Sequence, residues 1–270
     1  MNEILIILLF LVVGYGSGIL IGMLGIGGGL IFVPVLYFLL PLVGIPESTL
    51  AYYTIGTSLF TGAMAVTNSA ILHIRAKNFI RSTANLISLG SAITAFITPF
   101  FVVKLESKTL EIIFASVLFV ILISILFESN KRKWLMLSEP LSKKYYLPLG
   151  FFVGIFSSFV GLGGGVIYLP ALMNLFLVEV RTAVGTSSII ASVTMITATI
   201  SYLFQNANSS SQAWTLGFIV LPAAIPLGIG AIIGSFVGVS LAMRSSTFVI
   251  KKVFAAILII AIIRILIKLY

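Results

Sequence analysis

The 270-residue sequence contains no cysteine, no aspartate and a single histidine, and its seven acidic residues are all glutamate. Without cysteine, the chain forms no disulfide, no thiolate nucleophile and no Cys-ligated metal site. No Glu or Lys lies in the middle of an apolar stretch, so the chain offers no acid–base pair inside a membrane. We therefore expect neither enzymatic activity nor a bound metal ion.

Charge is scarce as well. Charged residues make up 9% of the sequence, whereas hydrophobic residues make up 60%. That leaves too little polar surface to cover a soluble globule, so the composition predicts an all-α polytopic membrane protein surrounded by a lipid bilayer. The net charge of +9 comes from Lys and Arg in short runs between apolar stretches. Such runs are typical of topology signals, and nucleic acid is not expected as a partner.

Most of the apolar stretches have the length of one membrane crossing, which is about 20 residues for a hydrocarbon core of about 30 Å. Six stretches fit this length: 50–72, 83–103, 109–127, 182–204, 214–242 and 251–269. Two longer stretches, 4–43 and 146–177, each contain Gly-Gly-Gly. A continuous helix over 4–43 would be about 60 Å long, twice the bilayer. We expect each to fold back at its glycines, as a longer arm followed by a shorter arm with a proline.

The glycine run belongs to a motif that occurs twice. Residues 22–36 read GMLGIGGGLIFVPVL and residues 158–172 read SFVGLGGGVIYLPAL, so that Gly28 corresponds to Gly164 and Pro34 to Pro170. Each glycine in a helix costs about 1 kcal/mol relative to alanine, so the two runs indicate two helix breaks. Membrane helices also use glycine for close packing, but at a spacing of four rather than in a run.

A second repeated segment follows each glycine motif. GTSL at 56–59 matches GTSS at 185–188, with a shorter connection from the glycine motif in the second half. Later elements show only the same order of apolar stretches. We therefore predict two homologous halves, 1–127 and 146–270, each with a Gly-broken hairpin plus three transmembrane helices, joined by a cytoplasmic linker over 128–145.

The basic residues predict an orientation. The segments 73–81 and 128–144 carry three and five Lys or Arg, which places both in the cytoplasm. If each glycine stretch returns to its starting side, twelve basic residues lie inside and four outside, whereas single crossings give ten and six. The fold-back arrangement is favoured, and it makes the halves inverted repeats with both chain ends outside. His73 begins the first basic segment, so we expect it at the surface.

A glycine run followed by a helix start exposes backbone N–H groups at the positive end of a helix dipole, which suits an anion. Broken helices at matching positions in two repeats also point to a transporter's substrate site. The GTS hydroxyls can donate to an anionic oxygen, although membrane Ser and Thr also bond to their own helix carbonyls. The residues predicted to bind the small anionic substrate are Gly27, Gly28, Gly29, Pro34, Thr57, Ser58, Gly163, Gly164, Gly165, Pro170, Thr186 and Ser187.

The two glycine–proline motifs, each followed by a GTS-containing helix, resemble those of the sulfite exporter TauE/SafE family of membrane transporters, over essentially the whole chain. The resemblance implies transport of small sulfur-containing anions, such as sulfite and sulfonates, across the prokaryotic plasma membrane. Nothing else in the sequence indicates sulfur. No cofactor is expected, because GLGGGV lacks the strand and the acidic partner of a dinucleotide site.

Two functions remain open: a carrier that works by alternating access, and an anion channel lined by the same backbone amides. Flux that saturates and shows counterflow indicates a carrier, and flux linear in concentration indicates a channel. Because no carboxylate lies within a span, we expect no acidic side chain to carry a coupling proton. Import or export, the coupling ion and the oligomeric state are not determined by the sequence.

Overall fold

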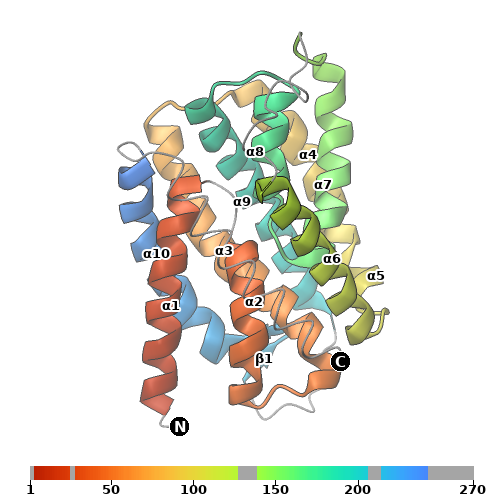
Figure 1. Ribbon diagram of the computed structural model, residues 1–270. Coiled ribbons are helices and arrows are strands. Elements are labelled where there is room, and N and C mark those ends of the chain that lie inside the picture. The colour runs from red at the N-terminus through yellow and green to blue at the C-terminus, as the bar shows by residue number, and fades with distance from the viewer. Residues whose placement is uncertain (1–2, 25–27, 127–138, 206–213, 243–270) are drawn as a thin grey trace.

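The computed structural model describes residues 3–24, 28–126, 139–205 and 214–242, which form a helical bundle (Figure 1). In the first half, the elements are α1 (Glu3–Leu24), α2 (Gly29–Leu39), the 3-10 helices η1 (Leu40–Val43) and η2 (Glu47–Thr49), α3 (Leu50–Arg75), α4 (Arg81–Ile97), α5 (Pro99–Val102) and α6 (Ser107–Leu126). In the second half, they are η4 (Lys143–Tyr145), α7 (Tyr146–Val160), α8 (Gly165–Asn174), α9 (Val180–Phe204), the strands β1 (Thr215–Leu216) and β2 (Ile219–Val220), and α10 (Leu221–Ala242).

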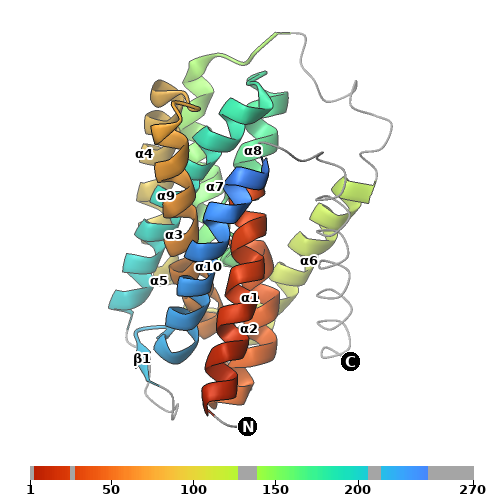
Figure 2. The same ribbon diagram turned by 90° about the vertical axis from the view of Figure 1, so that its left-hand side faces the viewer.

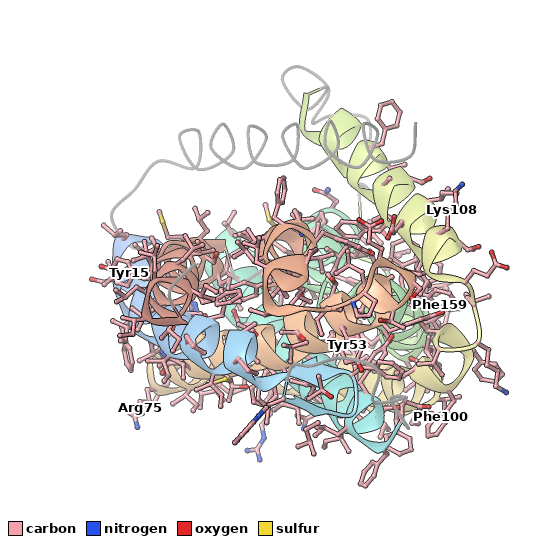
Figure 3. The ribbon with its side chains drawn as sticks, turned by 90° about the horizontal axis from the view of Figure 1, so that it is seen from below. Tyr15, Tyr53, Arg75, Phe100, Lys108 and Phe159 are labelled. Carbon is pink, nitrogen blue, oxygen red and sulfur yellow. The ribbon has the colours of Figure 1, made fainter. Side chains whose placement is uncertain are left out.

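Five helices of the described chain are long and apolar enough to cross a membrane: Ile4–Met23, Glu47–Arg75, Arg81–Val102, Val180–Phe204 and Leu221–Leu241. Large hydrophobic side chains are exposed along their outer faces, which suits contact with lipid. Figure 3 looks along the bundle and shows Tyr53 in its interior, with Tyr15 and Phe100 at the rim. Their exposed fractions are 1%, 39% and 41%. The predicted all-α, multi-pass membrane protein is therefore confirmed.

The predicted helix 214–242 is wrong at its start. Residues 215–220 form a β-hairpin, in which Thr215 pairs with Val220 and Leu216 with Ile219. Gly217 opens the two-residue turn with φ +55°, a conformation that favours glycine. Helix α10 begins only at Leu221, with Pro222 in its first turn, where a missing N–H costs no helical hydrogen bond. The predicted span 251–269 lies outside the described residues.

Each glycine stretch reverses direction. Figure 1 shows α1 rising from the N-terminal end of the bundle and the shorter α2 returning toward that end. The second stretch runs the other way, because α7 descends from the opposite end and α8 returns to it. Figure 2 accordingly shows α2 in the lower part of the bundle and α8 in the upper part.

The two halves exchange helices. Helices α3 and α9 pack together in the middle, α1 packs along α10, and α7 packs along α4. The same close backbone approaches occur in both outer pairs. A Cβ added to Gly14 of α1 would meet the backbone of Leu227 in α10, and one added to Gly150 of α7 would meet the backbone of Ile87 in α4. One helical turn further along each pair, Gly18 and Gly154 approach the facing helix in the same way. Leu227 of α10 therefore corresponds to Ile87 of α4, a match that their sequences do not reveal.

One buried core joins the halves. Its members include Leu30 and Tyr53 from the first half and Val160, Tyr202 and Leu227 from the second. Neither half therefore buries its apolar surface alone, and the region between them holds the candidate site.

Candidate substrate site

The two glycine breaks touch each other at the centre of the bundle. A Cβ added to Gly29 would lie 1.8 Å from the carbonyl oxygen of Gly161, the residue that ends α7. Gly28 lies beside Gly62, in the middle of α3, because a Cβ on Gly62 would lie 3.3 Å from the Gly28 amide nitrogen. The fold thus brings together two segments that come from different halves of the sequence.

Both short helices begin at their glycines in the same way. The Gly28 carbonyl accepts hydrogen bonds from Ile31 and Phe32, at 3.0 and 2.9 Å. The Gly164 carbonyl accepts from Ile167 and Tyr168, at 2.9 Å each. Neither α2 nor α8 has a side-chain cap, so the amides of their first two residues have no partner within the helix and lie at its positive end.

The two breaks differ in backbone conformation. Gly161, Gly163 and Gly164 have φ values of +74°, +74° and +72°, which only glycine adopts readily, whereas Gly28 has φ −74°. Gly27 lies outside the described residues. The second break therefore requires glycine for its turn, while Gly28 requires it for space, because a Cβ there would meet the Phe32 ring at 2.2 Å.

Ser58 connects the first GTS segment to the opposite break. Its hydroxyl is fully buried and donates to the Gly161 carbonyl at 3.0 Å. Ser187, its counterpart in α9, is also buried and donates to the Val184 carbonyl of its own helix at 3.0 Å. Of the predicted hydroxyls, Ser58 is thus placed beside a glycine break by a contact between the two halves.

Thr57 and Thr186 lie far apart along the bundle. The Thr57 hydroxyl accepts a hydrogen bond from the Val220 amide, and the Thr186 hydroxyl accepts one from the Ile80 amide, each at 3.0 Å. Gly185, next to Thr186, approaches His73. His73 lies sixteen residues beyond Thr57 in α3, which is about 24 Å of helix. One small anion cannot contact both threonines, so the fold does not bring these two predicted ligands together.

The two prolines differ in their surroundings. Both lie inside their short helices, but Pro34 is buried and Pro170 is exposed. The Pro170 side chain therefore faces away from the meeting point of the breaks.

His73 is buried, and its predicted surface position is wrong. Its exposed fraction is 6%, and neither ring nitrogen has a hydrogen-bond partner in the part of the chain that the structure describes. It lies under the α3–α4 connection, where the Asn78 amide donates to its carbonyl at 3.1 Å. The surface position was predicted because basic residues follow His73 in the sequence. The last turn of α3, which contains His73, nevertheless packs against α9.

Charged side chains lie away from the breaks. In the described ranges, every Lys, Arg and Glu lies in a connection or in the first or last two turns of a helix. Arg75 ends α3, Lys77 lies in the α3–α4 connection and Arg81 begins α4. This connection is at the end of the bundle where α7 and α9 begin (Figure 1). Arg75 and Lys108 accordingly project at the rim in Figure 3. No group of three or more His, Asp or Glu that could hold a metal ion occurs among the described residues.

Two residues beside the breaks were not predicted. Met195 of α9 and Gly62 of α3 meet there, and a Cβ on Gly62 would lie 2.2 Å from the Met195 Cε atom. Neither residue belongs to a repeated motif. The one sequence signal was a glycine at the midpoint of an otherwise ordinary span.

A multi-pass helical bundle whose two broken helices meet at its centre has the architecture of a membrane transporter. The family model for the sulfite exporter TauE/SafE matches residues 10–265. The chain belongs to the TauE/SafE family.

Relatives of similar length support this assignment. A probable membrane transporter protein of Haemophilus influenzae is 29% identical over 268 residues, which cover 97% of this chain and 98% of that protein. One of Methanocaldococcus jannaschii is 27% identical over 244 residues, which cover 90% and 89%. No solved structure matches the chain. The family's description and the names of these relatives thus both indicate membrane transport.

Proposed function

We propose that this protein carries small sulfur-containing oxyanions, such as sulfite or organosulfonates, across the prokaryotic plasma membrane. The observation that carries the proposal is the contact between Gly29, where α2 starts, and Gly161, where α7 ends, which joins the two helix breaks at the centre of the bundle. The family's description supplies the sulfur.

The site binds the anion with backbone amides. The first-turn amides of α2 and α8 supply donors, and each helix adds a partial positive charge of about 0.5 at its N-terminus. The substrate-contacting residues are then Gly28, Gly29, Gly163, Gly164 and Gly165, with the Ser58 hydroxyl beside them. Such a site needs no charged side chain, which agrees with the positions of Lys and Arg at helix ends.

The halves act as inverted repeats that expose this site to each side in turn. The opposite directions of the two hairpins and the exchange of α1 and α7 between the halves support this arrangement. The end with Arg75, Lys77 and Arg81 faces the cytoplasm, in keeping with the excess of basic residues there. The membrane potential alone can drive export, because it supplies about 2.3 kcal/mol per charge for each 100 mV.

The test is anion flux into proteoliposomes, measured with sulfite, methanesulfonate, sulfate and acetate. We expect saturable flux with counterflow for sulfite or methanesulfonate and little flux of acetate. Flux that rises linearly with concentration would instead indicate a channel, and equal flux of all four anions would contradict the substrate class.

Gly28→Leu locates the site within the same assay. Its φ permits a side chain, so the variant adds bulk at the amides by displacing the Phe32 ring rather than by straining the backbone. We expect it to abolish flux. Ser116→Ala is the control, because Ser116 is exposed on α6 and bonds only to the Ile112 carbonyl among the described residues. Wild-type flux in a folded Gly28→Leu protein would mean that the glycines serve packing alone.

A further inference from the structure

One side chain occupies the point where the two breaks meet. A Cβ added to Gly163 would lie 2.5 Å from the Met195 Sδ atom, and one added to Gly62 would lie 2.2 Å from its Cε atom. The Met195 side chain is fully buried. Its thioether is therefore held between two glycines, one from α3 and one from the second break, beside the Gly28 amide.

We infer that Met195 is the movable gate of the anion site and sets the largest substituent that a substrate can carry. This inference rests on the proposed function. The thioether fills space beside the amides that would hold the anion, so substrate enters only when the Met195 side chain turns aside. The space that it vacates then limits the size of the bound molecule.

The chemistry of methionine suits this role. Three rotatable bonds and a polarisable sulfur let the side chain fill an irregular gap and leave it without moving the backbone. When the two GTS segments are aligned, Met195 corresponds to Val66 of α3, which is fully buried and stiff at χ1. Of these two equivalent positions, only the one in the second half therefore carries a flexible side chain. The protein thus has two helix breaks but one gate.

A sulfonate size series tests the inference in proteoliposomes. The variant is Met195→Ala, and the substrates are sulfite, methanesulfonate, ethanesulfonate and butanesulfonate. Removing the thioether should raise the flux ratio of butanesulfonate to sulfite about tenfold or more, since space for a single methylene group already discriminates substrates by about that factor. Met64→Ala is the matched control. Met64 also packs on a glycine, Gly228, but at the α3–α10 contact, so the ratio should stay at the wild-type value.

A second variant covers the case in which Met195→Ala does not fold. The chain has no cysteine, so Met195→Cys provides a single thiol at the gate. An anionic sulfonate reagent, methanethiosulfonate ethylsulfonate, reaches this thiol through the site. We expect it to block flux, and excess methanesulfonate to slow the block.

The outcomes separate the two proposals. An unchanged size ratio in an active Met195→Ala protein, or a Met195→Cys protein that methanesulfonate does not protect, would overturn the gate and leave the transport proposal intact. Absence of flux for every anion in the folded wild-type protein would overturn the proposed function itself.

Discussion

Two equivalent pairs of contacts fix the backbone near the two ends of the bundle, and we call each pair a lock. In each lock, a GTS glycine packs against a carbonyl oxygen and the GTS threonine accepts a hydrogen bond from a backbone amide. At one end, Gly56 packs against Phe218 and the Thr57 hydroxyl accepts from the Val220 amide. At the other end, Gly185 packs against Asn78 and the Thr186 hydroxyl accepts from the Ile80 amide. Each lock holds the segment that precedes a helix of the opposite half.

The side chains behind the two locks differ. Phe218 packs against the rings of Tyr52, Tyr53 and Tyr202, with centroid distances of 5.6, 5.3 and 6.5 Å. The equivalent space at the other end holds His73, whose ring nitrogens have no hydrogen-bond partner among the described residues. Aromatic contacts of this kind add about 0.5–1.5 kcal/mol each, and a buried polar group without a partner costs free energy. The backbone contacts are therefore alike at the two ends, whereas the aromatic contacts around Phe218 stabilise one end only.

The largest effect is expected from the lock glycines. A Cβ on Gly185 would lie 1.8 Å from the Asn78 carbonyl oxygen, and one on Gly56 would lie 2.4 Å from the Phe218 carbonyl oxygen. We expect Gly185→Ala to lower the free energy of unfolding by about 3 kcal/mol or more and Gly56→Ala to lower it less, because overpacking against backbone forces a shift. Thermal unfolding in detergent measures both. Gly16→Ala, with open space at its Cβ, should cause no loss.

The lock threonines should show smaller and nearly equal effects. Thr57→Val and Thr186→Val each leave a backbone N–H without its acceptor, buried at Val220 and part-buried at Ile80, which costs about 1–3 kcal/mol. Thr57→Ser and Thr186→Ser keep the hydroxyl and should restore most of the stability. A large loss at one end only would mean that the two locks are not equivalent.

The smallest effects should come from the residues behind the locks. The Tyr202 hydroxyl donates to the Ser158 carbonyl at 3.0 Å, so Tyr202→Phe should cost about 1 kcal/mol. His73→Phe should cost nothing, because the ring nitrogens make no hydrogen bond with the described residues. If His73→Phe destabilises the protein as much as Tyr202→Phe does, the proposed difference between the two ends is wrong.

The sequence predicted features that depend on local signals. Hydropathy located the long helices, and the glycine runs located the breaks at Leu24–Gly29 and Val160–Gly165, because a run of glycines opposes a helix wherever it occurs. The beginning of α10 was missed, since the short hairpin before it is as apolar as the helix.

Contacts between the halves could not be predicted. The GTS pattern suggested hydroxyls at an anion site, but Thr57 and Thr186 have backbone amides as partners, and their distance depends on how α3 and α9 cross. The place of Met195 depends on the same crossing. The burial of His73 depends on the packing of the last turn of α3 against α9, which the basic residues that follow it do not signal.

The most direct test of the central claim is the position of a bound anion. Selenite, the selenium analogue of sulfite, can be located by anomalous X-ray scattering in crystals of the wild-type protein soaked at a concentration that saturates transport. The account predicts an anomalous peak in contact with the Gly28 amide, between Gly62 and Gly163, with the Met195 side chain turned away. A peak only beside Arg75, Lys77 and Arg81, with Met195 still between the two glycines, would contradict it.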